Sequence, residues 1–271
     1  MQKPDLNHAV VVLSGGQDST TCLFWALHHF DKVSAITFDY GQRHAVEIEA
    51  AQRVFTLAAD TSPKVGKHWL VKVGRILEST SPLVSDNELE QYADPQSLPD
   101  GLEKTFVPMR NQFFLTLAMN HAIAMGAATL VTGVCQEDYG GYPDCRQAFI
   151  DSLRITSALG LGLDAHELRI ETPLMNLSKA ESIWLADSLD ALGVLAWSHT
   201  SYDGQYPPTG KDHATLLREK GFTEARMPDP LILRAVDEGL MKMPDRVGYD
   251  SQAVASITEE IHRTRAILDA A

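Results

Sequence analysis

The feature that most constrains this chain is a turn with two glycines at residues 14–19, set between two apolar segments. Residues 9–12 are typical of a buried strand, and residues 22–27 are typical of a helix packed on a sheet. Gly15 and Gly16 lack a Cβ, so the turn can fold tightly and approach a ligand closely. Because the first N–H groups of the helix point back at this turn, the sequence predicts an anion site, usually one for phosphate.

The turn matches neither of the two common nucleotide-binding motifs. It lacks the Gly-Lys-Ser/Thr of Walker A and the third glycine of the dinucleotide fingerprint. With Asp18 and Ser19 it instead resembles the pyrophosphate loop (PP-loop) of the ATP pyrophosphatases, which split ATP between its α and β phosphates. The alternative interpretation is a serine-capped helix that follows a glycine turn and binds nothing.

Composition limits the class of protein. A chain of 271 residues suits one large domain, or one domain with an appendage. The net charge of −13 argues against a broad nucleic-acid-binding face but allows a local basic pocket. The three cysteines are far apart and form no C-x-x-C pair, so neither a disulfide framework nor a cysteine zinc site is indicated. Without a signal peptide or a membrane-spanning run, we expect a cytoplasmic protein with no membrane partner.

Strands and helices are predicted to alternate along the chain. The predicted strands are residues 9–12, 33–37, 68–73, 129–134 and 168–170. The predicted helices are residues 47–58, 111–125, 147–158 and 178–189, the last with Ser178 and Glu181 as a capping box. This alternation predicts an α/β fold, a doubly wound parallel sheet with ligands at the carboxyl ends of strands one, two and four. The long polar segment 78–104 is a candidate lid.

Six ordered segments together resemble the 7-cyano-7-deazaguanine synthase family of PP-loop ATP pyrophosphatases. They are residues 13–21, 38–44, 106–111, 132–139, 141–146 and 171–181, and the resemblance spans residues 8–205. It implies a PP-loop domain over 1–195, followed over 196–271 by a lid loop and a helical tail. It also implies an ATP-dependent C–N ligase that uses ATP, Mg²⁺, ammonia and 7-carboxy-7-deazaguanine, and that forms a homodimer.

The implied reaction adenylates a carboxylate, forms an amide with ammonia and activates that amide again to reach the nitrile. Spread negative charge in the transition state requires hydrogen-bond donors, cations and Mg²⁺. The resemblance implies catalytic roles for Asp18, Arg110 and Lys179. The residues implied to bind ATP are Ser14, Gly15, Gly16, Gln17, Ser19, Thr20, Arg43 and Gly133. Those implied to bind the deazaguanine are Tyr40, Glu137, Asp138, Tyr142, Asp144 and Arg146, since carboxylates accept from ring N–H groups and an aromatic ring stacks on a base.

Each of these assignments has a simpler alternative. Arg110 and Lys179 would otherwise form surface ion pairs, which is the commoner fate of such residues. Arg43 and His44 would belong to a solvated turn, and residues 142–146 would form a proline-stiffened loop. Cys145 is interpreted as a small buried thiol rather than a nucleophile.

The chain departs from the family pattern in three places. Ser201, Thr209, Asp212 and Thr215 align with the four cysteines that hold a zinc in the family, and hydroxyls are poor zinc ligands, so we predict no structural zinc. His199, Asp212 and His213 could form a substitute metal site, but we interpret the two histidines as solvated loop residues. Met109 replaces a glycine, which predicts a narrowed or reshaped pocket if that glycine allows a close approach. The tail from residue 221 contains Val254, Ile257, Ile261 and Leu268 at helical spacing, either packed on the domain or open to a partner.

These departures favour a relative that passes the adenylated carboxylate to another amine, such as one on a partner protein in a phage-defence system. Nitrile synthesis in queuosine biosynthesis stays open, because both outcomes share the same activation. Two further alternatives are a catalytically weakened nucleotide-binding partner protein and another PP-loop synthetase. The acidic chain argues against a nucleic-acid substrate.

Overall fold

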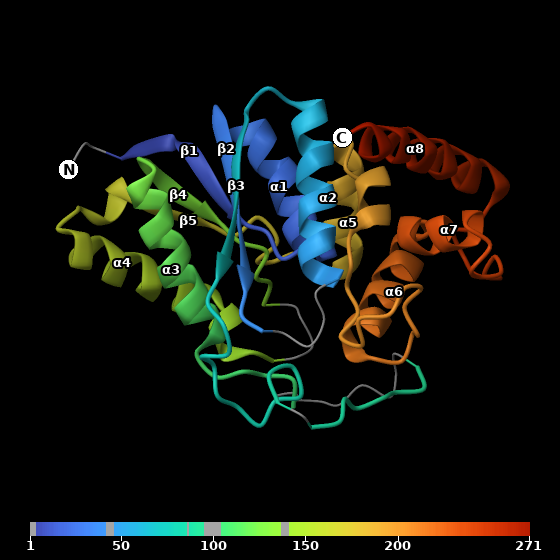
Figure 1. Cartoon of the computed structure of the whole chain (residues 1–271), viewed down its shortest axis with the longest axis horizontal. Coiled ribbons are helices and arrows are strands. Elements are labelled where there is room, and N and C mark those ends of the chain that lie inside the picture. Colours follow the sequence, from blue (N-terminus) through green and yellow to red (C-terminus); the bar gives the residue numbers. More distant parts are fainter. Residues whose placement is uncertain (1–3, 42–45, 86, 95–103, 137–140) are drawn as a thin grey trace.

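The computed structural model describes residues 4–41, 46–85, 87–94, 104–136 and 141–271 (Figure 1). Five parallel strands form the central sheet in the order β3-β2-β1-β4-β5. They are β1 (Asp5–Val12), β2 (Lys32–Asp39), β3 (Val65–Lys72), β4 (Ala127–Val131) and β5 (Arg169–Glu171). Parallel strands are covered on both faces, which is why their sequences are nearly continuous apolar runs.

Helices cover both faces of this sheet. One face carries α1 (Gln17–His29), α2 (Val46–Thr61) and α5 (Lys179–Ser188), and the other carries α3 (Arg110–Ala124) and α4 (Gln147–Leu161). Successive side chains of β1 point to opposite faces, so Val11 packs with Leu23 of α1 while Val10 packs with Phe114 of α3. The predicted doubly wound α/β fold is therefore confirmed.

The predicted elements up to residue 189 all appear, with ends shifted by a few residues. Ser178 caps α5, because its Oγ accepts from the backbone N of Glu181 at 3.3 Å, and the Glu181 carboxylate accepts from the backbone N of Ser178 at 2.8 Å. The described parts of segment 78–104 contain no helix or strand. There, the backbone N of Tyr92 donates to the carbonyl of Lys211 at 2.8 Å. The lid assignment stays a prediction.

The C-terminal part is more helical than the sequence predicted. It contains a 3₁₀ turn, η4 (Gly193–Trp197), and the helices α6 (His213–Ala225), α7 (Pro230–Asp237) and α8 (Ser251–Ala270). We predicted only the last of these helices. We did not predict α6 and α7 because Gly221 and Pro230 are residues that usually interrupt helices. Gly221 lies in α6 where a Cβ would be 2.8 Å from Cβ of Lys179 on α5, and Pro230 occupies the first position of α7.

The tail helix packs on the domain, which is the first of the two alternatives. Ile257 and Ile261 are buried in the same core as Leu195 and Phe222. Trp197 donates its indole N–H to Oγ1 of Thr264 at 2.8 Å. The core thus contains side chains from both sides of position 195, and the division into 1–195 and 196–271 stays a prediction. Among the helices of the described residues, none combines the length and apolar character needed to cross a membrane.

Candidate active site

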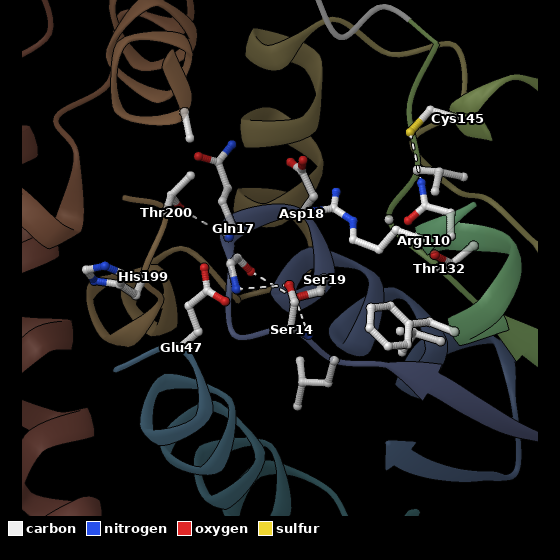
Figure 2. A pocket seen from close by; sticks show the side chains of 18 of the residues that line it. Ser14, Gln17, Asp18, Ser19, Glu47, Arg110, Thr132, Cys145, His199 and Thr200 are labelled. Atoms are coloured by element: carbon white, nitrogen blue, oxygen red, sulfur yellow. Dashed lines mark hydrogen bonds between the residues drawn. The ribbon is translucent and has the colours of Figure 1, made fainter. Parts of the chain in front are cut away.

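A cavity of about 350 Å³ lies at the carboxyl ends of three strands (Figure 2). Ser14 and the start of α1 reach it from β1, Tyr40 reaches it from β2, and Gly133 reaches it from β4. The chain leaves β1 for β2 and β3 on one side of the sheet, and returns to β4 and β5 on the other. This reversal point is where open α/β sheets bind ligands, so the structure brings the predicted motifs together at the expected edge.

The turn at residues 14–19 is held by its own hydroxyl groups. Ser19 Oγ accepts from the backbone N of Ser14 at 3.2 Å and lies 3.0 Å from Ser14 Oγ. The fully buried Thr20 donates from Oγ1 to the carbonyl of Gly16 at 2.8 Å. Gly16 is the N-cap of α1 and places no side chain over the first N–H groups of that helix. The start of α1 therefore faces the cavity without a capping side chain, where the helix dipole favours an anion, and Thr20 supports the turn without lining the cavity.

Gly15 is required both by its conformation and by its surroundings. Its φ is +87°, in the left-handed region, and a Cβ would lie 2.3 Å from the carbonyl oxygen of Glu47 and 2.7 Å from the backbone N of Ala51. The first turns of α2 therefore pack directly against the PP-loop. Gly15 supports the site from behind and does not line the cavity.

Two of the predicted catalytic residues form an ion pair in the cavity. Lys179, the first residue of α5, places Nζ 2.7 Å from Oδ2 of Asp18 on α1, and the two side chains are only 17% and 26% exposed. Arg110, the first residue of α3, also lines the cavity. In Figure 2 its side chain extends toward Asp18. Lys179 and Arg110 thus bring two positive charges to the Asp18 side of the cavity, an arrangement suited to anionic ligands.

The predicted deazaguanine residues divide into two groups. Tyr40 and Tyr142 line the cavity, whereas Asp144 and Arg146 do not. Asp144 is buried: its Oδ2 accepts from the backbone N of Asn111 at 3.3 Å, and its Oδ1 has no hydrogen-bond partner within the described ranges. Arg146 is exposed at the start of α4. The predicted residues Arg43, Glu137 and Asp138, and also His44, lie outside the described residues.

Gln17 is the one predicted ATP-binding residue whose side chain is both buried and unsatisfied among the described residues. It is 3% exposed and lines the cavity, and neither polar atom of its amide has a hydrogen-bond partner there. An unsatisfied buried polar group costs about 1–3 kcal/mol. The Gln17 amide therefore favours occupation of the cavity by a polar ligand.

We did not predict that the segment after η4 contributes side chains to the cavity. His199 and His213 line the cavity and are 4% and 5% exposed, so our interpretation of them as solvated loop residues was wrong. The cause is tertiary: the backbone N of His199 donates to the carbonyl of Gly15 at 2.8 Å, which draws the loop across the sheet edge. Burial lowers the pKa of His213 to about 4, so its imidazole is neutral near pH 7. Glu47, Thr200 and Arg218 are further lining residues that we did not predict.

A buried ion pair supports this loop from the far side. Arg218 of α6 donates from Nε and Nη2 to the two carboxylate oxygens of Asp229, at 2.7 and 2.8 Å. Its Nη1 donates to Oγ1 of Thr200 at 3.0 Å, and the same Oγ1 accepts from the backbone N of Gln17 at 3.4 Å. A continuous set of polar contacts therefore connects the start of α7 to the PP-loop. No local sequence motif predicts this ion pair, because Arg218 lies in α6 and Asp229 lies at the start of α7.

Comparison with known proteins agrees with this geometry. A family model described as queuosine biosynthesis protein QueC matches residues 8–226. The chain belongs to the QueC family. It is 48% identical over 233 residues to the 7-cyano-7-deazaguanine synthase of Gloeobacter violaceus, covering 83% of this chain and 96% of that relative. It is 47% identical over 232 residues to the 7-cyano-7-deazaguanine synthase of Chromobacterium violaceum, covering 85% and 95%.

Likeness to solved structures is more distant. A 4-thiouridine synthetase, in complex with RNA and bound ATP, matches at 16% identity with a TM-score of 0.45, over 96% of this chain and 53% of that chain. The family resemblance predicted from the sequence is confirmed by the family model and by the relatives.

At the four aligned positions this QueC family member has three hydroxyl side chains and one carboxylate, and the absence of a structural zinc stays a prediction. Ser201 Oγ lies 2.8 Å from Oδ2 of Asp212, Thr215 donates its backbone N–H to Oδ1 of Asp212 at 3.1 Å, and Thr209 reaches Ser201 through the carboxylate of Asp203. We call these five residues the Asp212 cluster. Hydroxyls do not fit zinc, which requires thiolate, imidazole or carboxylate ligands. Within the described ranges no group of three or more His, Cys, Asp or Glu residues is placed to hold a metal ion.

The Met109 side chain does not narrow the cavity, so the first of the two expected effects is not found. Its side chain is 59% exposed and does not line the cavity. The replacement of glycine by methionine affects the backbone instead. Met109 has φ 64°, a left-handed conformation that glycine adopts without strain.

Proposed function

We propose that this protein uses ATP to adenylate the carboxylate of 7-carboxy-7-deazaguanine and, with ammonia, converts it to 7-cyano-7-deazaguanine. The observation that carries the proposal is the N-terminus of α1, which Gly16 leaves without a capping side chain, beside the Asp18–Lys179 pair, both facing one cavity. Support for the substrate comes from relatives named 7-cyano-7-deazaguanine synthase that the chain matches over 95–96% of their length.

ATP suits the described residues at the PP-loop end of the cavity. The backbone N–H groups that follow Gly16, together with Ser14 and Ser19, would hold the departing pyrophosphate. Asp18 would hold Mg²⁺, which neutralises charge on the phosphates during adenylyl transfer. Lys179 and Arg110 provide fixed positive charge where the transition state becomes more anionic.

A flat heteroaromatic acid suits the other lining residues. Aromatic rings of Phe38, Tyr40 and Phe114 line one part of the cavity, and the centroids of Tyr40 and Phe114 are 5.0 Å apart. Tyr142 also lines the cavity, and its hydroxyl lies 2.6 Å from the hydroxyl of Thr105. Aromatic walls favour a planar ligand by stacking, and Arg110 is placed to attract its carboxylate.

This proposal and the alternative of transfer to a partner protein differ in the amine that attacks the adenylated carboxylate. Coverage of almost the whole length of the named synthases supports ammonia and a nitrile product. The apolar face of α8 packs on the chain's own core. The apolar pattern of the tail is therefore explained without a partner protein. The homodimer, the cytoplasmic location and transfer to a protein amine stay predictions from the sequence.

The test is mass spectrometry of the products formed from ATP, Mg²⁺ and 7-carboxy-7-deazaguanine, with and without ammonium. The proposal predicts the amide and the nitrile only when ammonium is present, with AMP and pyrophosphate formed alongside. AMP and pyrophosphate without either product would show activation for a different nucleophile. Absence of AMP under all conditions would overturn the proposed function.

A further inference from the structure

The cavity contains a second carboxyl group, that of Glu47, to which the sequence assigned no role. Glu47 lies in the first turn of α2, and its backbone packs against Gly15 of the PP-loop. Figure 2 shows its side chain beside that loop, among the lining residues. Asp18 is already paired with Lys179, whereas the Glu47 carboxyl has no hydrogen bond or ion pair with any other described residue.

The surroundings of Glu47 give it an unusual proton affinity. Burial raises the pKa of Glu47 from 4.5 to about 7, and the charge of Arg110 on α3 acts in the opposite direction. Tyr40, which follows β2, also interacts with this carboxyl. The other titratable groups that line the cavity are Asp18 of α1, Lys179 of α5, Tyr142 and Cys145 before α4, and His199, Tyr202, His213 and Arg218 of the C-terminal part. A group with such a pKa exchanges protons efficiently at neutral pH.

The proposed reaction requires a proton acceptor at two points. Near neutral pH ammonia is present as ammonium, which has no lone pair. One proton must therefore leave before the nitrogen can attack the acyl carbon. Later, the adenylated amide carries an N–H proton that must leave before the C≡N bond can form. PP-loop donors and cations stabilise the phosphates in both steps, but they cannot accept these protons.

We infer that Glu47 is the general base of the amine-dependent steps; this inference rests on the proposed function. In the first step the Glu47 carboxylate takes a proton from ammonium, the nitrogen lone pair attacks the acyl carbon, and the C–O bond to AMP breaks with its electron pair leaving on AMP. The nitrogen then gives its second proton to water, and Glu47 releases its own proton to solvent, which leaves the neutral amide and a regenerated carboxylate. In the second step ATP adenylates the amide oxygen with release of pyrophosphate, and one N–H proton leaves to water, which gives a neutral O-adenylated imidate. The Glu47 carboxylate takes the remaining N–H proton, that N–H electron pair forms the second π bond of the nitrile, and the C–O bond breaks with its electron pair leaving on AMP.

The decisive comparison is between two nucleophiles in the Glu47→Gln variant. Hydroxylamine is neutral near pH 7 and attacks an acyl-adenylate without a base, giving a hydroxamate. We expect Glu47→Gln to form hydroxamate from ATP and 7-carboxy-7-deazaguanine at a rate close to wild type, while amide and nitrile formation with ammonium falls by about 100-fold or more. Glu47→Asp should recover part of the ammonium-dependent rate. Glu49→Gln is the matched control, because Glu49 is exposed on the same helix turn.

A pH profile separates this role from a structural one. The deficit of Glu47→Gln in amide formation should shrink as pH rises toward the alkaline range, where ammonia is already unprotonated. Equal loss of hydroxamate and amide, or no loss of either, would overturn the role of Glu47 while leaving the proposed function intact. A wild-type protein that forms neither hydroxamate nor AMP would overturn both.

Discussion

Lys179 Nζ lies 2.7 Å from Oδ2 of Asp18, although 161 residues separate them in the chain. The contact brings together the first turns of α1 and α5 at the carboxyl edge of the sheet. Positive ends of two helix dipoles and one ammonium therefore converge on the place where we put the phosphates of ATP. The Asp18 carboxylate balances this charge and orients Lys179.

Asp18→Ala should abolish pyrophosphate release. Loss of the carboxylate removes the group that orients Lys179 and would hold Mg²⁺, so we expect a decrease of roughly 100- to 1000-fold. A coupled pyrophosphate assay with ATP and 7-carboxy-7-deazaguanine measures it. Asp31→Ala, at an exposed position, is the control. Undiminished release in Asp18→Ala would show that ATP binds elsewhere.

Arg218→Met should destabilise the fold strongly. Arg218 and Asp229 are 2% and 7% exposed, and removing one partner leaves a buried charge unpaired, at a cost of about 3–5 kcal/mol. Urea denaturation measures the free energy of unfolding. The double variant Arg218→Met/Asp229→Leu should recover part of the loss. The control is Arg246→Ala, which breaks the more exposed pair with Glu219 and should lower the free energy of unfolding by less than about 1 kcal/mol. Equal losses for the two arginine variants would show that the buried pair contributes no more than a surface pair.

Asp212→Ala should lower the melting temperature without any involvement of metal. Asp212 joins Ser201 to Thr215 in the Asp212 cluster, and the loss of these buried hydrogen bonds corresponds to about 1–3 kcal/mol. Calorimetry with and without a chelator, together with metal analysis of the purified protein, checks this. Stoichiometric zinc in wild type, or a chelator-sensitive melting temperature, would contradict the prediction. Asp245→Ala, at an exposed position, serves as the control.

Gly15→Ala and Gly160→Ala should act in opposite directions. A Cβ at Gly15 would collide with the backbone of α2, 2.3 Å from the Glu47 carbonyl, so both stability and pyrophosphate release should fall. Gly160 lies in α4 with open space around its Cβ position, so alanine should stabilise by about 0.5–1 kcal/mol. Thermal melting and the pyrophosphate assay test both variants. Gly15→Ala with wild-type stability would show that the PP-loop and α2 are not in this contact.

The stability of Glu47→Gln should depend on pH relative to wild type. Because the pKa of Glu47 is raised by burial from 4.5 to about 7, the folded state binds its proton more tightly than the unfolded state does. Its contribution to stability is complete below the unfolded pKa and is lost as pH rises through 7. Glutamine cannot ionise, so the variant should melt above wild type at pH 8, with the difference shrinking by pH 5. A difference that does not change between these pH values would show that the Glu47 pKa is ordinary.

Much of the fold and part of the site could be predicted because their determinants are local. Apolar β-branched runs such as residues 9–12 predicted parallel strands, and Ser178 with Glu181 predicted the start of α5. The glycine turn predicted an anion site from the conformational freedom of Gly15, and the structure shows why no other residue fits there. Tyr40 and Gly133 could be placed at one edge because parallel strands end together, whereas Lys179 was assigned from the family resemblance.

The sequence by itself determined the doubly wound sheet, the PP-loop and the QueC family, because periodicity and motif spacing are properties of short segments. Only the tertiary structure decided that His199, His213 and Glu47 face the same cavity, and that Arg146 does not. Their roles depend on burial and on contacts between distant elements, such as the hydrogen bond from His199 to Gly15. Burial also sets the proton affinity of Glu47, because the free energy of a buried charge depends on what surrounds it in space.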